Sequence, residues 1–239
     1  MKSKTTKKLK LGIFLFLLFT LPIGAIAQVT VYICGSATAT LQPDFKTYTL
    51  VNGDKVVWNE KAPDGNTVAT TYTFGTDPSV NFTTANNLND GAYTYTVHVT
   101  PADETKCPGD VSTEYVVYKL PASVALASPV ASFCSDAGTA SSSVITATPS
   151  SSVADITPTY TWSATLNGSP VASIATLGSS SANVFTVKPD VTAGAYIFRV
   201  TASYDTGAVP VKAAGPCVIE STIPITVTSK PGKPTVTVL

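Results

Sequence analysis

Four cysteines, Cys34, Cys107, Cys134 and Cys217, are the side chains of this 239-residue sequence best suited to covalent chemistry. No two have the C-x-x-C spacing that is typical of zinc sites and redox motifs. In an exported chain, an even number of cysteines indicates a disulfide framework. The sequence therefore predicts four disulfide-bonded cysteines and assigns none of them a nucleophilic role.

His98 is the single histidine, so any histidine-based triad must be built around it. Its neighbours Val97 and Val99 are expected to face a core, which directs His98 to solvent with the threonines on the same face. No recognisable nucleophile or orienting acid lies near it in the sequence. We therefore predict an exposed strand histidine, no catalytic residue, and a chain that is not an enzyme.

Acidic side chains are the remaining candidates, because paired carboxylates cleave glycosides and clustered loop carboxylates bind calcium. They occur singly in expected turns or beside a cysteine, at Asp44, Asp54, Asp64, Asp77, Asp90, Asp103, Glu104 and Asp110. No D-x-D-x-D-G run is present, and narrow sandwich domains offer no large cleft. We expect ordinary turn aspartates with no cofactor and no metal, although calcium in the loops stays open.

The segment 1–27 has the three-part order of a secretory signal peptide. Five lysines between positions 2 and 10 precede an apolar run over positions 11–21, and Ala25 and Ala27 stand before a cleavage site at Gln28. The apolar run is short for a permanent membrane span, so an uncleaved anchor is the weaker alternative. The sequence predicts a protein that is secreted or displayed at the cell surface.

Removal of this segment takes away five lysines and no acidic residue, so the mature chain 28–239 carries a net charge of −5. No basic patch interleaved with aromatic residues is present, which argues against a nucleic-acid partner. No later segment is apolar enough to predict stable membrane insertion. The remaining length fits two small domains.

Comparison of the sequence with itself reveals two copies of one unit. The segment 91–100 (GAYTYTVHVT) matches 194–203 (GAYIFRVTAS), and a tryptophan precedes each at nearly the same spacing, Trp58 in the first copy and Trp162 in the second. An early cysteine precedes each tryptophan, and a late cysteine follows each Gly-Ala-Tyr segment. Landmarks that recur in one order predict two related domains.

Inside each unit the hydrophobic pattern has the period of two that is typical of strands. Besides the two Gly-Ala-Tyr segments, the expected strands are 38–41, 55–59, 79–83 and 114–119 in the first unit, and 143–147, 159–164, 183–187 and 223–228 in the second. We find no amphipathic helix. The sequence predicts an all-β chain with two tandem immunoglobulin-like β-sandwich domains, residues 28–120 and 121–230. Residues 231–239 are expected to begin a third repeat, or else to close the second.

The landmarks resemble the immunoglobulin-like and PKD-like repeats of secreted bacterial cell-surface, adhesin-type proteins. The matching residues are Cys34, Trp58, Gly91, Tyr93, Val97 and Cys107 in the first copy, and Cys134, Trp162, Gly194, Tyr196, Val200 and Cys217 in the second. The resemblance covers nearly all of residues 28–230 and implies that Trp58, Tyr93, Trp162 and Tyr196 are core residues. It implies an architecture and no particular ligand.

In antibody-type domains the second cysteine lies in the strand that carries the tyrosine, whereas here it follows that strand in the next loop. We expect the pairs Cys34–Cys107 and Cys134–Cys217, because they repeat from unit to unit and keep each bridge within one domain. The two other pairings stay open.

A non-catalytic extracellular adhesion module, binding module or spacer is the expected function, with an extracellular protein or glycan as partner. One alternative is a carbohydrate-binding accessory region of a longer secreted enzyme. It requires exposed aromatic residues on one sheet face, drawn from Tyr32, Tyr48, Tyr72, Phe74, Phe133 and Tyr204. A second alternative is a pilin-like subunit that donates residues 235–239 as a strand.

Overall fold

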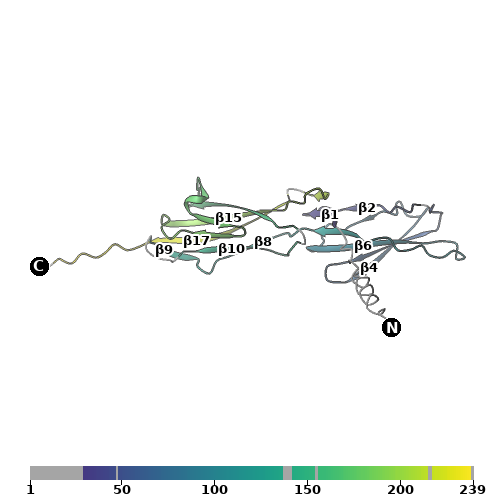
Figure 1. Ribbon diagram of the computed structural model, residues 1–239, viewed down its shortest axis with the longest axis horizontal. Coiled ribbons are helices and arrows are strands. Elements are labelled where there is room, and N and C mark those ends of the chain that lie inside the picture. Colours follow the sequence, from purple (N-terminus) through teal and green to yellow (C-terminus); the bar gives the residue numbers. More distant parts are fainter. Residues whose placement is uncertain (1–28, 47, 137–141, 154–155, 215–216, 238–239) are drawn as a thin grey trace, which may run out of the picture.

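The computed structural model describes residues 29–46, 48–136, 142–153, 156–214 and 217–237, so the predicted signal peptide lies outside the described residues. Two β-sandwiches lie end to end along the longest axis (Figure 1). Within the described ranges, the single helical element is a 3-10 turn, η1, at Ile174–Thr176. The prediction of an all-β chain with two tandem sandwiches is confirmed.

The first sandwich packs a six-stranded sheet against a two-stranded one. The larger sheet has the order β16 (Val211–Ala213), β1 (Val29–Cys34), β7 (Tyr115–Lys119), β6 (Gly91–Thr100), β3 (Lys55–Lys61) and β4 (Thr67–Thr73). The smaller sheet pairs β2 (Thr40–Leu41) with β5 (Phe82–Thr83). Strand β1 runs parallel to both β7 and β16, and the other neighbours are antiparallel.

The second sandwich packs a five-stranded sheet against a four-stranded one. The first has the order β12 (Ser169–Pro170), β11 (Thr159–Leu166), β15 (Gly194–Ser203), β17 (Val218–Ser229) and β9 (Ser132–Ser135). The second has the order β13 (Gly178–Ser181), β14 (Val184–Val187), β10 (Val144–Pro149) and β8 (Val124–Ala127). Strand β9 runs parallel to β17 as β1 does to β7, so the two sandwiches share this edge arrangement.

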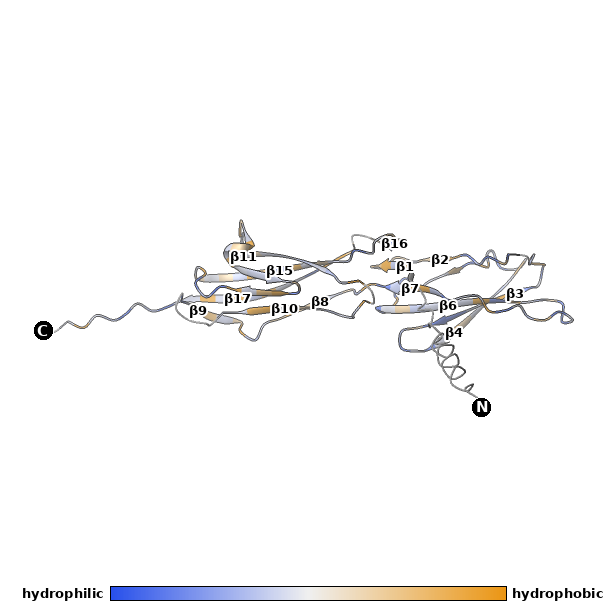
Figure 2. Cartoon of the chain, viewed as in Figure 1, coloured by the Kyte–Doolittle hydropathy of each residue, from blue (hydrophilic) through white to orange (hydrophobic). Residues whose placement is uncertain are grey.

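Each core is built around a tryptophan and two further aromatic rings. Ring centroids are 5.8 Å apart for Trp58 and Phe82, 5.2 Å for Phe82 and Tyr95, 5.6 Å for Trp162 and Phe185, and 5.4 Å for Phe185 and Phe198. All six rings are buried, and hydrophobic residues are distributed over the strands of both halves (Figure 2). The landmark tryptophans are thus core residues and not exposed platforms for a sugar.

The repeated Gly-Ala-Tyr motif has a local structural reason. Gly91 has φ 129°, and a Cβ added to it would lie 2.8 Å from Cγ of Pro63, so a side chain is excluded. Two residues later, the Tyr93 hydroxyl accepts a hydrogen bond from the Asn89 amide at 3.0 Å. The equivalent Tyr196 hydroxyl donates to the Thr192 carbonyl at 2.8 Å. Each buried tyrosine therefore fastens the loop before its own strand, as in a tyrosine corner.

Each of the ten expected segments contains or overlaps a strand, and the two Gly-Ala-Tyr segments, 91–100 and 194–203, match β6 and β15 at both ends. Segments 38–41 and 79–83 shrink to two residues each, beside Pro43 and Pro78, which cannot donate to a ladder. Strands β1, β4, β8, β9, β12, β13 and β16 were not expected. The strand expected over 235–239 is not formed at residues 235–237, which are exposed, and residues 238–239 lie outside the described residues.

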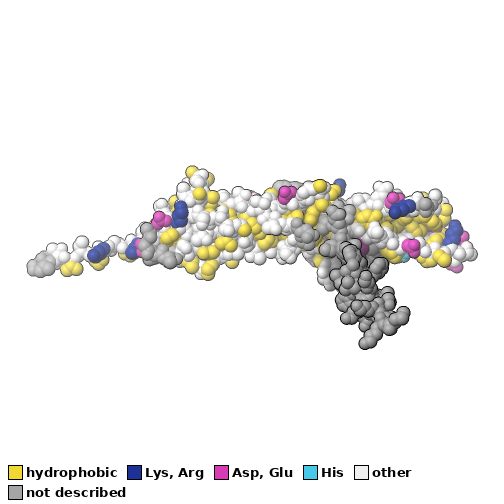
Figure 3. Space-filling model, viewed as in Figure 1, with side chains coloured by type: hydrophobic (Ala, Val, Ile, Leu, Met, Phe, Trp, Pro, Cys, Tyr) yellow, Lys and Arg dark blue, Asp and Glu magenta, His cyan; other side chains and the backbone are white. Residues whose placement is uncertain are grey.

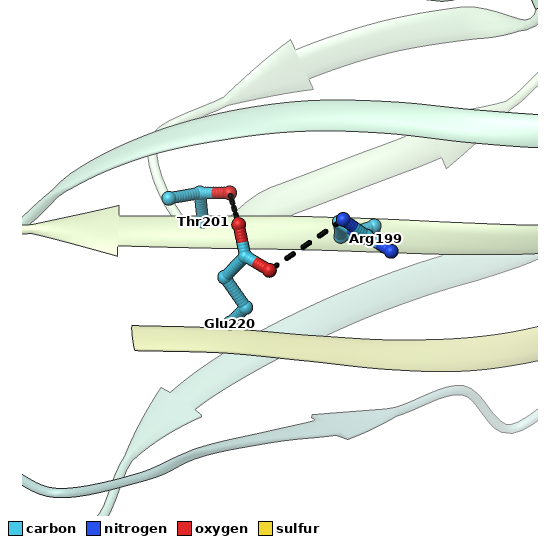
Figure 4. A network of polar contacts seen from close by, with 3 residues as sticks. All are labelled: Arg199, Thr201 and Glu220. Carbon is cyan, nitrogen blue, oxygen red and sulfur yellow. Dashed lines mark hydrogen bonds and ion pairs between the residues drawn. The ribbon is translucent and has the colours of Figure 1, made fainter. Parts of the chain in front are cut away.

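Charged side chains are scattered over a largely uncharged surface (Figure 3). On the outer face of the five-stranded sheet, Arg199 on β15 lies 3.5 Å from Glu220 on β17, and Thr201 is within 3.3 Å of the same carboxylate (Figure 4). Both charged side chains are about half exposed, so this pair contributes only about 0–1 kcal/mol.

Candidate functional site

A disulfide connects the two sandwiches where they meet. It joins Cys34, at the end of β1, to Cys217, which precedes β17, with a Cα–Cα distance of 5.5 Å. Cys107 and Cys134 are exposed free thiols. The expected pairs Cys34–Cys107 and Cys134–Cys217 are therefore wrong, and within a single chain Cys34 and Cys217 are the two bridged cysteines.

The strand directions explain this outcome. Strand β1 runs toward the joint and carries Cys34 there, whereas β6 runs away from the joint. The loop after β6, which contains Cys107, is consequently at the far end of the first sandwich. The matching loop of the second sandwich is at the joint, so Cys217 reaches Cys34.

A short strand from the second sequence unit completes the sheet of the first sandwich. Residues 204–214, which follow β15, cross the joint and supply β16, which pairs in parallel with β1 from Tyr32↔Val211 to Cys34↔Ala213. The Tyr32 amide donates to the Pro210 carbonyl at 2.9 Å. Residues 211–213, expected in the domain 121–230, thus extend the sheet of its neighbour.

Apolar side chains fill the joint beside the disulfide. This joint cluster contains the buried residues Tyr32, Cys34, Tyr118 and Leu120, packed against the partly buried Val153, Ile156, Tyr204, Val209 and Cys217 of the second sandwich. The rings of Tyr32 and Tyr118 lie 6.0 Å apart. The Tyr118 hydroxyl donates to the Ser152 carbonyl at 2.6 Å, which adds a polar contact across the joint.

Polar groups around the joint cluster are also paired, some across the joint and some within the first sandwich. Asp90, in the loop before β6, accepts hydrogen bonds from the Ala122 amide at 3.3 Å and the Ser150 hydroxyl at 2.5 Å. The Lys119 ammonium donates to the Gly35 carbonyl. Burial lowers the pKa of Lys119, and the negative charge of Asp90 partly offsets this effect. Burial, with smaller contributions from Tyr160, Asp90 and Tyr118, raises the pKa of Tyr204 to about 12.

The sequence contains a signal for the joint that the repeat comparison overlooked. Residues 31–34 and 116–119 are each buried at four consecutive positions, so both faces of β1 and β7 are covered. Consecutive apolar residues, as in Tyr115-Val-Val-Tyr118, indicate such a strand, whereas alternation indicates one exposed face. The equivalent part of β17, Ile223–Val227, alternates between more buried and exposed residues.

A groove of about 580 Å³ lies at the free end of the first sandwich, away from the joint. Its lining comes from three places: residues 44–46 and Tyr48, residues 97–99 of β6 with Pro101 just after it, and the return segment between residues 107 and 115. Tyr48 is 36% exposed and Val111 is 60% exposed, so the rim offers apolar surface to a partner. Loops held on a sandwich in this way are common binding surfaces.

His98 lies in this groove and is partly buried, which corrects the expectation of an exposed histidine. The return segment covers it, because the Val99 carbonyl accepts from the Gly109 amide and the Val97 carbonyl from the Ser112 amide, both at 2.8 Å. Within the described residues, Nδ1 of His98 is buried and has no hydrogen-bond partner. Cys107 and Asp110 also line the groove, without a hydrogen bond to that atom.

Asp54 is a structural carboxylate, although the sequence suggested an ordinary turn residue. It is fully buried and accepts hydrogen bonds from the Tyr48 hydroxyl at 2.8 Å and from the Val51 and Ala102 amides at 2.9 Å each. Burial raises the pKa of Asp54, but these hydrogen bonds outweigh it, so the pKa lies below its ordinary value. The carboxylate therefore holds two loops that frame the groove.

Replacing Asp54 by Asn is expected to lower the free energy of unfolding at neutral pH by about 2–4 kcal/mol, because an amide nitrogen would face the backbone donors. A depressed folded-state pKa stabilises the protein above the unfolded pKa of about 4, and this stabilisation is lost as the pH falls further. The D54N variant should lose less stability than the wild type below about pH 4. Urea unfolding across that pH range measures both effects. Asp64→Asn, in an exposed turn, is the control and should change stability by less than about 0.5 kcal/mol.

The remaining predicted residues do not gather into a site. Among the described residues, no three His, Cys, Asp or Glu side chains are arranged to hold a metal ion. Of the aromatic residues that would mark a sugar-binding face, Tyr32 and Phe133 are buried and Tyr204 is in the joint cluster. Tyr72 and Phe74 lie in the first sandwich and are partly exposed, and Tyr48 is exposed at the rim of the groove.

No helix in the described part of the chain is long and apolar enough to cross a membrane. No protein-family model matches the chain, and no curated protein matches it. Structural similarity is found to tandem domains of low sequence identity.

Three such structures are the chicken CNTN1 FN1-FN3 domains (13% identity, 84% of this chain, 64% of that chain, TM-score 0.28), Sidekick-1 immunoglobulin domains 1-4 (13%, 85%, 48%, 0.36) and the N-terminal four Ig domains of Dscam1 isoform 9.44 (12%, 86%, 44%, 0.33). This chain spans 44–64% of the length of these structures. At these values the similarity carries no inference about activity, and the immunoglobulin-like architecture rests on the strand arrangement described above.

Proposed function

We propose that this chain is a non-catalytic extracellular or cell-surface spacer whose two sandwiches form a stiff rod with a binding surface at its free end. The joint carries the proposal. Strand β16, the Cys34–Cys217 disulfide and the joint cluster are three separate linkages across one boundary. Flexibly tethered domains need none of them, and relative motion is the usual expectation for a small interface.

The Cys34–Cys217 disulfide also supports the proposed extracellular location. Disulfides persist in oxidising compartments, which supports export by the predicted signal peptide. The exposed Tyr48 and Val111 at the groove support a protein partner at the free end. The resemblance to adhesin-type repeats is consistent with a role in attachment.

Single-molecule energy transfer between dyes on the two native thiols tests the rod. Cys107 and Cys134 lie in opposite sandwiches, beyond two collinear ten-residue strands, β6 and β15. At about 3.3 Å per residue, these strands alone separate the dyes by roughly 65–70 Å. One narrow peak of energy-transfer efficiency is expected at this separation. Dyes with longer linkers should shift the position of the peak by a constant amount and leave its width unchanged.

A variant with Cys34→Ser, Cys217→Ser and Tyr118→Ala removes two of the linkages and should broaden the peak. A broad distribution in the unmodified protein would rule out a stiff spacer. The carbohydrate-binding alternative gains no support, since Tyr32 and Phe133 are buried and Tyr204 is packed in the joint cluster.

A further inference from the structure

We propose that Cys107 of one copy of this chain forms a disulfide with Cys134 of a second copy, so that chains join head to tail. The disulfide between Cys34 and Cys217 shows, inside a single chain, how two successive units are linked. It links the early cysteine of one unit to the late cysteine of the next. Cys134 is the early cysteine of the second unit and Cys107 the late cysteine of the first, and both are free and exposed. This inference does not depend on the proposed spacer function.

The sheet register places the two early cysteines at equivalent positions. In the first sandwich Gly91 pairs with Lys119, which pairs with Ile33, the residue before Cys34. In the second, Gly194 pairs with Val227, which pairs with Phe133, the residue before Cys134. Cys134 therefore occupies, at the C-terminal end of the second sandwich, the place that Cys34 occupies at the joint.

The two late cysteines are also equivalent within their hairpins. Ser203 pairs with Val218, so Cys217 lies across from Tyr204, the first residue after β15. The Val99 carbonyl accepts from the Gly109 amide, so Cys107 lies across from Pro101, the first residue after β6. Five residues separate Pro101 from Cys107, whereas twelve, including β16, separate Tyr204 from Cys217, so the first hairpin has the shorter tip. The register still places Cys107 at the free end of the first sandwich as it places Cys217 at the joint.

The surroundings of Cys134 leave space for a loop from a second copy of the chain. Strand β9, which carries Cys134, lies at the edge of its sheet. It is the counterpart of β1, and no strand in the described part of the chain covers on β9 the edge that β16 covers on β1. The Cys134 thiol is exposed, and the Thr228 hydroxyl lies 3.4 Å from its sulfur.

The distribution of charge favours a contact between opposite ends of two chains over a contact between two identical ends. The loop 101–114 holds four acidic residues and one lysine, a net charge of −3. The opposite end of the chain holds Asp136, Lys188, Asp190, Lys230 and Lys233, a net charge of +1. Two copies of the acidic loop repel each other, whereas the loop and the C-terminal end attract weakly.

A second copy is the partner that fits, because one chain carries both halves of the contact. The joint cluster is not repeated at the ends, since Ser132 and Thr226 replace Tyr32 and Tyr118 in the matching register. The covalent bond, and not an apolar interface, would hold the copies together. Assembly should therefore depend on redox conditions.

The bond forms by thiol–disulfide exchange with a disulfide oxidant, such as oxidised glutathione or an oxidised protein dithiol. The two thiols lose two protons and two electrons to form the sulfur–sulfur bond. The oxidant gains them, its own sulfur–sulfur bond breaks, and it leaves as two thiols.

Treatment of the purified chain with oxidised glutathione tests the proposal. The wild type should give a ladder of oligomers on non-reducing gels, which a reductant collapses to the monomer. Peptide mapping of mixed isotope-labelled and unlabelled protein should identify Cys107–Cys134 as an intermolecular cross-link. A monomer that retains both free thiols would overturn the proposal.

Two single variants, Cys107→Ser and Cys134→Ser, separate this contact from random oxidation. Mixed together, they should form a heterodimer in about tenfold excess over either like pair, equivalent to about 1.4 kcal/mol. The variant Cys134→Ser with Ser179→Cys moves the thiol to an exposed strand of the same sandwich and should cross-link to Cys107 about tenfold less. Equal yields in either comparison, or a bond from Cys134 to a different polypeptide in protein isolated from its cell, would contradict the proposal.

Discussion

Replacing Cys34 and Cys217 together by Ser is expected to lower the free energy of unfolding by about 2–5 kcal/mol. The two residues are 183 positions apart, and loop-closure entropy for so long a loop reaches about 5 kcal/mol. Both thiols are replaced at once, so no unpaired reactive cysteine is left at the joint. Chemical unfolding at neutral pH, without reductant, measures the change.

The matched control is the double variant with Cys107→Ser and Cys134→Ser. It removes the two exposed thiols and should change stability by less than about 0.5 kcal/mol, because neither is bonded within the monomer. Thiol titration checks the assignment, with two free thiols expected in the native monomer and none in the control. If the control loses as much stability as the Cys34 and Cys217 variant, the joint disulfide has been assigned to the wrong cysteines.

The disulfide and strand β16 act on the same short segment of β1. Tyr32, Ile33 and Cys34 pair with Val211, Lys212 and Ala213, and the bridge is fixed at the last of these positions. A hinge motion at the joint would have to separate a hydrogen-bonded strand pair and strain a covalent bond together. The joint is therefore expected to resist bending even where its apolar area is small.

The repeats could be predicted because their landmarks have local physical causes. The Gly-Ala-Tyr motif requires a glycine where a Cβ would meet Pro63, and a tyrosine that fastens the preceding loop. Trp58 and Trp162 fill the same place in each core. Such features repeat at a fixed interval in each unit, so comparison of the sequence with itself detects them.

The disulfide pairing could not be predicted, because sequence order does not say whether a loop faces its own unit or the next. In an immunoglobulin-like sandwich, the two expected partners lie at opposite ends of the domain. A strand of five or six residues is about 17–20 Å long, whereas bridged Cα atoms lie within about 7 Å. Pairing between neighbouring units removes this conflict, since Cys34 and Cys217 meet at one boundary.

Strand β16 left no signal in the sequence. Its three residues, Val211–Ala213, are all exposed and show no alternation, so the strand exists only because the edge of β1 is beside it. His98 was mispredicted for a similar reason. The segment that covers it, around Gly109 and Ser112, is tied to β6 by single backbone hydrogen bonds and lacks a regular hydrophobic pattern.

Tyr118→Ala is expected to lower the free energy of unfolding by about 3–5 kcal/mol, as for other large aromatic residues truncated in a core. Tyr118 is 6% exposed and packs against Tyr32 from within the first sandwich, while its hydroxyl reaches Ser152 of the second. Its loss leaves a cavity inside the joint cluster and removes a hydrogen bond across it. The energy-transfer peak between labelled Cys107 and Cys134 should also broaden.

Two conservative variants separate the contributions of the ring and the hydroxyl. Tyr118→Phe keeps the ring and removes the hydrogen bond to Ser152, so about 1 kcal/mol should be lost. Tyr204→Phe, in the same cluster, removes a buried hydroxyl that has no hydrogen-bond partner in the described residues, so stability should stay equal or rise. If Tyr118→Ala and Tyr204→Phe have the same effect, the cluster does not couple the sandwiches. The disulfide and β16 would then be the linkages that hold the rod straight.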